Sequence, residues 1–259
     1  MQSGRVTGRI ASIYRHPVKG FTPERLQAAD LVAGEGFPCD RLYAVENGPS
    51  GFDPAAPVFI SKQHFTVLMR IAEVARARTA YDEATGVLTA SADGLETISA
   101  RLTDAAGRET FTAWLATLLG EEAQGPLRVI EAPGSWRFMD HPLGHVSIIN
   151  LASVRDLEAR IGRPIDPLRF RANIYVEGWE PWIENTWTDR LLDLGGARAK
   201  VFKPTVRCAA THVDPVTAER DMDVVKALFD NYGHMFCGIY VHTQTAGRVR
   251  EGDAVELLA

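Results

Sequence analysis

Hydrophobic and polar positions alternate loosely over residues 5–15, which is the pattern of a strand that buries one face. Residues 42–46 and 58–61 are short apolar strand candidates, and glycine- and proline-rich connections separate them. Later strand candidates cover residues 169–177, 197–204, 237–243 and 253–258. We therefore predict strands at all seven places.

Apolar residues at helical spacing occur at fewer places than strand-like stretches. Five apolar residues recur at helical intervals before a glycine stop at Gly120: Phe111, Trp114, Leu115, Leu118 and Leu119. A predicted strand over 146–150 runs into a helix with Ser153 as candidate N-cap and Gly162 as its stop. Another helix is predicted over 222–232. Residues 65–79 fit a helix or the approach to a hairpin over 80–90, and the pattern leaves both open.

Short strands with a minority of helices predict a β-rich α+β fold with a barrel-like domain, and argue against a doubly wound sheet. The pattern changes at a loop rich in glycine and proline over residues 125–144. We therefore predict a domain boundary near residue 125.

Composition narrows the classes of function. The chain has 259 residues, 46% hydrophobic and 24% charged, as expected of a globular protein with a sizeable core. A net charge of −5 argues against binding to nucleic acid, which needs a broad basic surface. No signal-peptide core and no apolar stretch of membrane-spanning length is evident, so we expect a cytoplasmic protein.

The three cysteines, Cys39, Cys208 and Cys237, are too few and too far apart for a disulfide framework, a C-x-x-C zinc site or a four-cysteine iron–sulfur cluster. Cys237 lies in an apolar strand pattern and is interpreted as a small buried hydrophobic residue. Cys39 lies at a turn, and its role stays open. Cys208 differs because Arg207 precedes it and the polar run A-A-T-H-V-D-P follows it.

Four polar groups of residues fall at predicted strand ends or loops. They are H-P-V-K-G with Lys19, C-D-R-L-Y with Arg41, F-R-A-N with Arg171 and Asn173, and V-R-C with Arg207 and Cys208. Each has a structural explanation when taken alone, because strand arginines usually lie on a solvated face and a lysine before glycine marks a turn. Asn173 is the exception, since an amide inside an apolar strand needs hydrogen-bond partners.

Taken together, the motifs carry a resemblance. Their order is H-P-V-K-G, C-D-R-L-Y-A-V, F-R-A-N-I-Y-V-E-G, E-N-T-W, V-R-C-A-A-T-H-V-D-P and G-R-V-R-E-G-D-A-V-E-L-L. This ordered set resembles the MOSC superfamily, in particular the group of the mitochondrial amidoxime-reducing component and its bacterial relatives. The resemblance spans nearly the whole chain and implies an amino-terminal β-barrel domain over residues 5–124 and a MOSC domain over residues 125–259.

The resemblance implies a molybdenum–pterin cofactor (molybdopterin) with Cys208 as the metal ligand and the reactive position. A soft thiolate suits the metal, and a pterin dithiolene would supply further sulfur donors. The charge of Arg207 favours the thiolate. The resemblance also implies that four residues hold the pterin and its phosphate: Lys19, Arg41, Arg171 and Asn173. Ser153 matches a cofactor-contact position of the family, and Asn150 lies close to it in sequence.

The expected function is molybdenum-dependent, two-electron reduction of N-hydroxylated compounds with N–O cleavage. A small-molecule substrate and a separate electron-transfer protein or reductase are the implied partners, without nucleic acid or a membrane span. The alternative is a carrier of the molybdenum cofactor or of sulfur that has no turnover of its own. We expect no pyridoxal-phosphate domain of the kind found in a whole cofactor sulfurase. A barrel that has lost the cofactor is a third reading.

Several positions depart from the family pattern, and other site motifs are missing. Gly20 follows the lysine where relatives have serine, Ala172 replaces a proline, and Asn185 stands in place of an acidic residue. His212 replaces a threonine, and we interpret it either as a residue on the substrate side or as a solvated loop histidine. His141 and His145 are spaced as in a zinc helix, but Pro142 and Gly144 argue against that helix.

Overall fold

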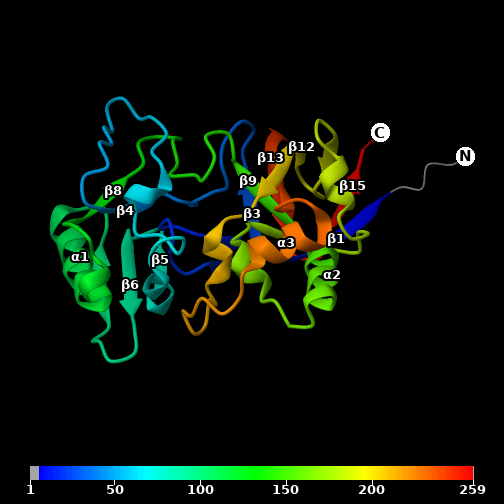
Figure 1. The fold of residues 1–259 in the computed structure, drawn as a ribbon. Coiled ribbons are helices and arrows are strands. Elements are labelled where there is room, and N and C mark those ends of the chain that lie inside the picture. Colours follow the sequence, from blue (N-terminus) through cyan, green and yellow to red (C-terminus); the bar gives the residue numbers. More distant parts are fainter. Residues whose placement is uncertain (1–5, 259) are drawn as a thin grey trace, which may run out of the picture.

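Seven strands form a closed barrel in the computed structural model, which describes residues 6–258 (Figure 1). Around the barrel they are β10 (Ile174–Glu177), β9 (Val146–Asn150), β13 (Phe236–Thr245), β12 (Arg198–Val206), β11 (Leu191–Asp193), β15 (Ala254–Leu257) and β1 (Thr7–Arg15). The pairing of β1 with β10 closes the ring, and β2 (Glu24–Leu26) adds to β1 outside it. The pair β9–β10 is parallel and the others are antiparallel.

Alternating residues of these strands fill the barrel, as the period-two pattern predicts. Ile13, Ile148, Ile174, Val201 and Val241 are fully buried in one cluster. The first strand of the chain therefore packs with strands that follow it by more than a hundred residues.

The amino-terminal half forms smaller sheets beside the barrel (Figure 1). One pairs β4 (Tyr43–Asn47) with β8 (Leu127–Glu131), and another joins β5 (Arg78–Asp82), β6 (Val87–Ser91) and β7 (Ile98–Arg101). Helix α1 (Ala105–Leu119) packs against β7 and β8, with Phe111 and Leu115 fully buried. A third pair, β3 (Ala28–Leu31) with β14 (Gly247–Arg250), joins sequence from both ends of the chain.

Two helices lie against the barrel, α2 (Leu151–Ile161) and α3 (Val224–Tyr232). Short 3₁₀ turns occupy η1 (Lys62–His64), η2 (Ala72–Arg76), η3 (Gly120–Glu122), η4 (Pro167–Phe170), η5 (Ile183–Thr186) and η6 (Ala209–His212). The open segment 65–79 thus contains η2 and the start of β5, and the hairpin over 80–90 is confirmed by the β5–β6 pair. The helix that ends at Gly120 and the helices of the second half are also confirmed.

Three local predictions are wrong. Residues 58–61 form no strand, because they have no partner and leave Val58 and Phe59 exposed. The strand predicted over 169–177 begins only at Ile174, since η4 and a left-handed residue at Arg171 precede it. Helix α2 is capped by Asn150, whose side chain accepts a hydrogen bond from the Ala152 N–H, so Ser153 lies inside the helix.

The remaining predicted strands are confirmed within a residue or two of their bounds. Arg5, the first residue of the strand and domain predicted from the sequence, lies outside the described residues. Within residues 6–258 no helix has the length and apolar character needed to cross a lipid bilayer.

Candidate functional site

A pocket of about 250 Å³ lies where loops of the barrel meet the amino-terminal half. Cys208 lines it from the start of η6, directly after β12. Arg41, Arg171 and Arg207 line the same pocket, so the structure brings together four of the predicted site residues. Several lining residues were missed from the sequence: Lys62, Met139, Asp140, His141, Ser147, Arg169, Lys203, Thr205 and Tyr240.

Cys208 is partly exposed, and its backbone is extended. The Lys62 ammonium donates a hydrogen bond to the Cys208 sulfur at 3.1 Å. Burial lowers the pKa of Lys62, but the charges of Asp140 and Cys208 outweigh this, so the pKa is raised overall. Lys62 therefore faces the sulfur as a cation and donates a charged hydrogen bond to it.

Arg41 and Arg171 form the cationic wall of the pocket. The Arg41 guanidinium donates to a carboxylate oxygen of buried Asp40 and, at 3.0 Å, to the Arg171 carbonyl. Nη2 of Arg171 is buried and has no hydrogen-bond partner. Burial and the neighbouring Arg41 charge lower the pKa of Arg171 to about 10. An uncompensated buried donor in a pocket wall is suited to an anionic ligand.

Lys19 lies in an adjoining cavity of about 30 Å³, which it shares with Arg41, Lys62, Asp140 and Arg171. Its ammonium is buried and donates to the Phe138 carbonyl at 2.9 Å and to the Asp140 carboxylate. Burial lowers the pKa of Lys19. Partial desolvation raises the pKa of Asp140, but the charges of Lys19 and Lys62 outweigh it, so the pKa is lowered overall.

The Arg207 guanidinium donates mainly to backbone carbonyls. It contacts the Cys237 carbonyl through Nε at 2.8 Å and the Phe170 carbonyl through Nη1 at 2.8 Å. It also lies over the Phe170 ring, 5.2 Å from the centroid. Arg207 thus ties the segment before Cys208 to β13 and to η4, in addition to placing a charge at the pocket.

Asn173 lies behind the pocket wall. Its side-chain oxygen accepts hydrogen bonds from the Ser147 N–H and hydroxyl, each at 3.0 Å, and its amide nitrogen donates to the Tyr14 carbonyl at 3.3 Å. Asn173 is fully buried and does not line the pocket, whereas Ser147 does. The expected need for partners is confirmed, and they come from the barrel itself.

The structure does not bring Ser153 to this pocket. The Ser153 hydroxyl and the Asn150 amide both donate to buried Glu184, each at 2.8 Å. Burial raises the pKa of Glu184. Neighbouring Asn185 has both side-chain polar atoms buried without a partner. These residues form a second polar cluster, distinct from the residues around Cys208.

The remaining histidine and cysteine predictions have clear outcomes. Cys237 is fully buried in β13, as interpreted from its apolar context, and Cys39 is buried at a turn with φ of 52°. Residues 141–145 form a turn and no helix. His212 contacts Asp223 at 3.0 Å and does not line the pocket. Among residues 6–258 no group of three histidine, cysteine or acidic side chains is arranged to hold a metal ion.

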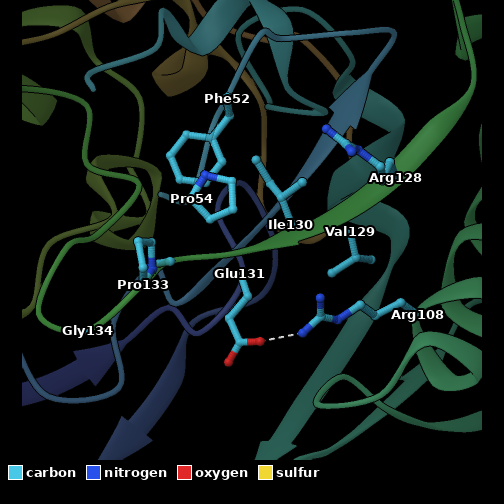
Figure 2. Close-up of a pocket in the computed structure, with 10 residues that line it drawn as sticks. Phe52, Pro54, Arg108, Arg128, Val129, Ile130, Glu131, Pro133 and Gly134 are labelled. Atoms are coloured by element: carbon cyan, nitrogen blue, oxygen red, sulfur yellow. Dashed lines mark hydrogen bonds and ion pairs between the residues drawn. The ribbon is translucent and has the colours of Figure 1, made fainter. Parts of the chain in front are cut away.

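A larger cavity of about 510 Å³ lies elsewhere, on β8 (Figure 2). Arg108 and Glu131 form an ion pair at its edge, and Phe52, Ile130 and Pro133 contribute apolar surface. No residue predicted to be functional lines this cavity. The chemistry-bearing residues thus gather at the smaller pocket.

Comparison with known proteins gives partial alignments to two kinds of curated protein. The molybdenum cofactor sulfurase of Caenorhabditis elegans is 34% identical over 132 residues, covering 49% of this chain and 18% of that protein. The mitochondrial amidoxime-reducing component 1 of Mus musculus is 31% identical over 123 residues, covering 43% of this chain and 36% of that protein. These alignments thus span little more than a third of such relatives at most.

A solved structure, the YUAD protein from Bacillus subtilis, aligns over 98% of this chain and 96% of its own at 13% identity and a TM-score of 0.46. Family models match almost the whole chain. The MOSC N-terminal beta barrel domain matches residues 7–125, which include β1, and the MOSC domain matches residues 137–256. The chain therefore belongs to the MOSC family and combines both of these domains.

Proposed function

We propose that this protein is a molybdenum-cofactor-dependent oxidoreductase that reduces N-hydroxylated compounds. The observation that carries the proposal is the convergence of one accessible thiol, Cys208, with the cations Lys62, Arg41 and Arg171 in one pocket. The similarity to proteins named amidoxime-reducing component and molybdenum cofactor sulfurase supports the same class of cofactor.

The residues present fit a pterin cofactor with a phosphate tail. Buried Nη2 of Arg171 and the buried Thr205 hydroxyl both lack a partner, and both residues line the pocket. A phosphate or the polar edge of a pterin would satisfy such groups. Lys19 and Arg41 would add charge at the inner end, and the Cys208 sulfur would ligate the metal.

The reaction takes up two electrons and two protons: an N-hydroxy compound becomes the corresponding N–H compound, and the oxygen leaves as water. When bound, the cofactor would supply the two-electron chemistry. The chain's own residues would hold the anionic tail at Arg41 and Arg171 and orient the Cys208 sulfur. A separate electron-transfer protein would supply the electrons by transient docking.

The test compares wild type with Cys208→Ser, both expressed with molybdate in a host that makes the cofactor. We expect near-stoichiometric molybdenum and pterin in the wild type, with the metal lost in the variant. Cys237→Ala, which removes a thiol outside the pocket, is the matched control and should retain both. Turnover of benzamidoxime with reduced methyl viologen as donor then measures N–O reduction.

The second candidate function is a carrier of the cofactor or of its sulfur, which the sulfurase similarity favours. Full loading without turnover of any amidoxime or hydroxylamine would replace the reductase by the carrier. Full loading of Cys208→Ser would remove Cys208 as the ligand. Absence of molybdenum and pterin from wild type would remove both functions and leave the fold unaffected.

A further inference from the structure

Lys62 comes from outside the MOSC domain. It lies in η1, within the segment matched by the amino-terminal barrel domain, and 146 positions before Cys208. Its ammonium nevertheless donates to the Cys208 sulfur at 3.1 Å. The immediate surroundings of the thiol are thus built jointly by both domains.

The turn that carries Lys62 is fixed by its neighbours. The Phe65 N–H donates to the Lys62 carbonyl at 3.2 Å, and the Thr66 N–H donates to the Val45 carbonyl of β4 at 2.9 Å. Phe65 is buried and packs against Phe138 with ring centroids 5.7 Å apart. The backbone of Lys62 is therefore anchored in the core, and only its side chain spans the distance to the sulfur.

We propose that Lys62 is a positioning residue for Cys208: it holds the sulfur at the pocket and withdraws electron density from it by a charged hydrogen bond. Hydrogen bonds to a ligating sulfur weaken its donation and raise the potential of the metal it binds. The effect on the metal rests on the proposed function; the effect on the sulfur does not.

The effect of Lys62 on the Cys208 sulfur is tested in the full chain without metal, produced in a host unable to make the cofactor. The second-order rates of Cys208 alkylation by anionic iodoacetate and by neutral iodoacetamide are measured at one pH, and their ratio is taken. Both reagents attack the same thiolate, so the ratio cancels the thiolate fraction and reports the local charge. Cys208→Ser gives the background from other cysteines.

We expect Lys62→Met to lower the iodoacetate-to-iodoacetamide ratio several-fold and Lys62→Arg to restore most of it. Lys203→Met is the matched control, because Lys203 lines the same pocket but has its ammonium over the Phe202 ring. The control should change the ratio less. An equal loss in both methionine variants, or no loss in Lys62→Met, overturns the proposal.

The effect of Lys62 on the metal is tested by redox titration of protein loaded with the cofactor. We expect a more negative midpoint potential in Lys62→Met than in wild type, with Lys62→Arg in between and Lys203→Met near wild type. An unchanged potential in Lys62→Met overturns the tuning of the metal. If wild type takes up no molybdenum, the proposed function fails, and the alkylation ratio still decides whether Lys62 acts on the sulfur.

Discussion

Arg41 and Arg171 share an uncommon backbone conformation, with φ of 50° and 51°, and the Arg41 guanidinium donates to the Arg171 carbonyl at 3.0 Å. Left-handed backbone is unfavourable for a side chain with a Cβ. Burial and the neighbouring Arg41 charge also lower the pKa of Arg171, so keeping this guanidinium charged has an electrostatic cost. The fold thus tolerates a strained backbone and an electrostatic penalty while two guanidinium groups lie at one pocket wall, an arrangement suited to ligand binding.

Arg171→Gly should stabilise the metal-free protein by about 1 kcal/mol, because it removes both the strained backbone and a buried charge. Urea unfolding with an unchanged m-value measures this difference in unfolding free energy. Arg171→Ala removes the charge but keeps the strain, so it should be less stable than Arg171→Gly. The same glycine variant should lose pterin in a cofactor-competent host. A glycine variant less stable than the alanine variant would contradict this reading.

His16 should make the fold sensitive to mild acid. It is fully buried, and burial together with the charges of Arg41 and Arg171 lowers its pKa to about 3. The unfolded chain binds this proton near pH 6.5, so stability is complete above that pH and falls on acidification toward pH 3.

Over this pH range His16 makes the free energy of unfolding fall on acidification with a slope that approaches about 1.4 kcal/mol per pH unit. Urea unfolding of wild type and His16→Gln at pH 7.5 and pH 5.0 isolates it, since the histidines other than His16 are present in both proteins. The wild type should lose more stability between the two pH values. Parallel losses would exclude His16 as the source.

The native chain should react with Ellman's reagent at one thiol and the unfolded chain at three. Cys39 and Cys237 are buried, and burial raises the pKa of each to about 12, whereas Cys208 is partly exposed. Absorbance counts the thiols before and after denaturant. A native count above one would show that a buried cysteine becomes accessible.

Gly238→Ala should damage the pocket from within the barrel. Gly238 has φ of +76°, and a Cβ there would clash with the Ile148 carbonyl oxygen and lie 3.3 Å from Nη2 of Arg207. We expect a loss of about 2–3 kcal/mol in unfolding free energy and a displaced Arg207.

Gly162→Ala is the control for Gly238→Ala. It shares a left-handed φ of +67°, but a Cβ added there would meet only open space. It should cost about 1 kcal/mol, the contribution of the backbone alone. Equal losses in the two variants would mean that the clash at Gly238 is relieved at no cost.

Local pattern predicted most of the barrel strands and the helices, because strands such as β1 and β12 alternate between buried and more exposed positions and each helix has a cap and a glycine stop. It failed at residues 58–61, where an apolar run has no partner strand. Such a run has the composition of a strand, and only the tertiary arrangement decides whether a neighbour is present.

Only the site residues that lie in recognisable sequence motifs could be predicted. Arg41, Arg171, Arg207 and Cys208 meet at one pocket, but Lys62 has no motif around it and reaches the sulfur through a contact between distant segments. Asn173 and Ser153 were chosen by motif position, and the structure shows their polar atoms bonded to Ser147 and Glu184. Whether a side chain faces a pocket or supports it from behind depends on packing, which motif position does not encode.

The position of β1 in the barrel has a consequence for biosynthesis. Its partners β10 and β15 are translated long after it, and β15 lies near the far end of the sequence. At about 5–20 residues per second, β1 would wait roughly tens of seconds on the ribosome for its last partner. Only its pairing with β2 can form early, so closure of the barrel should be a late and slow step of folding.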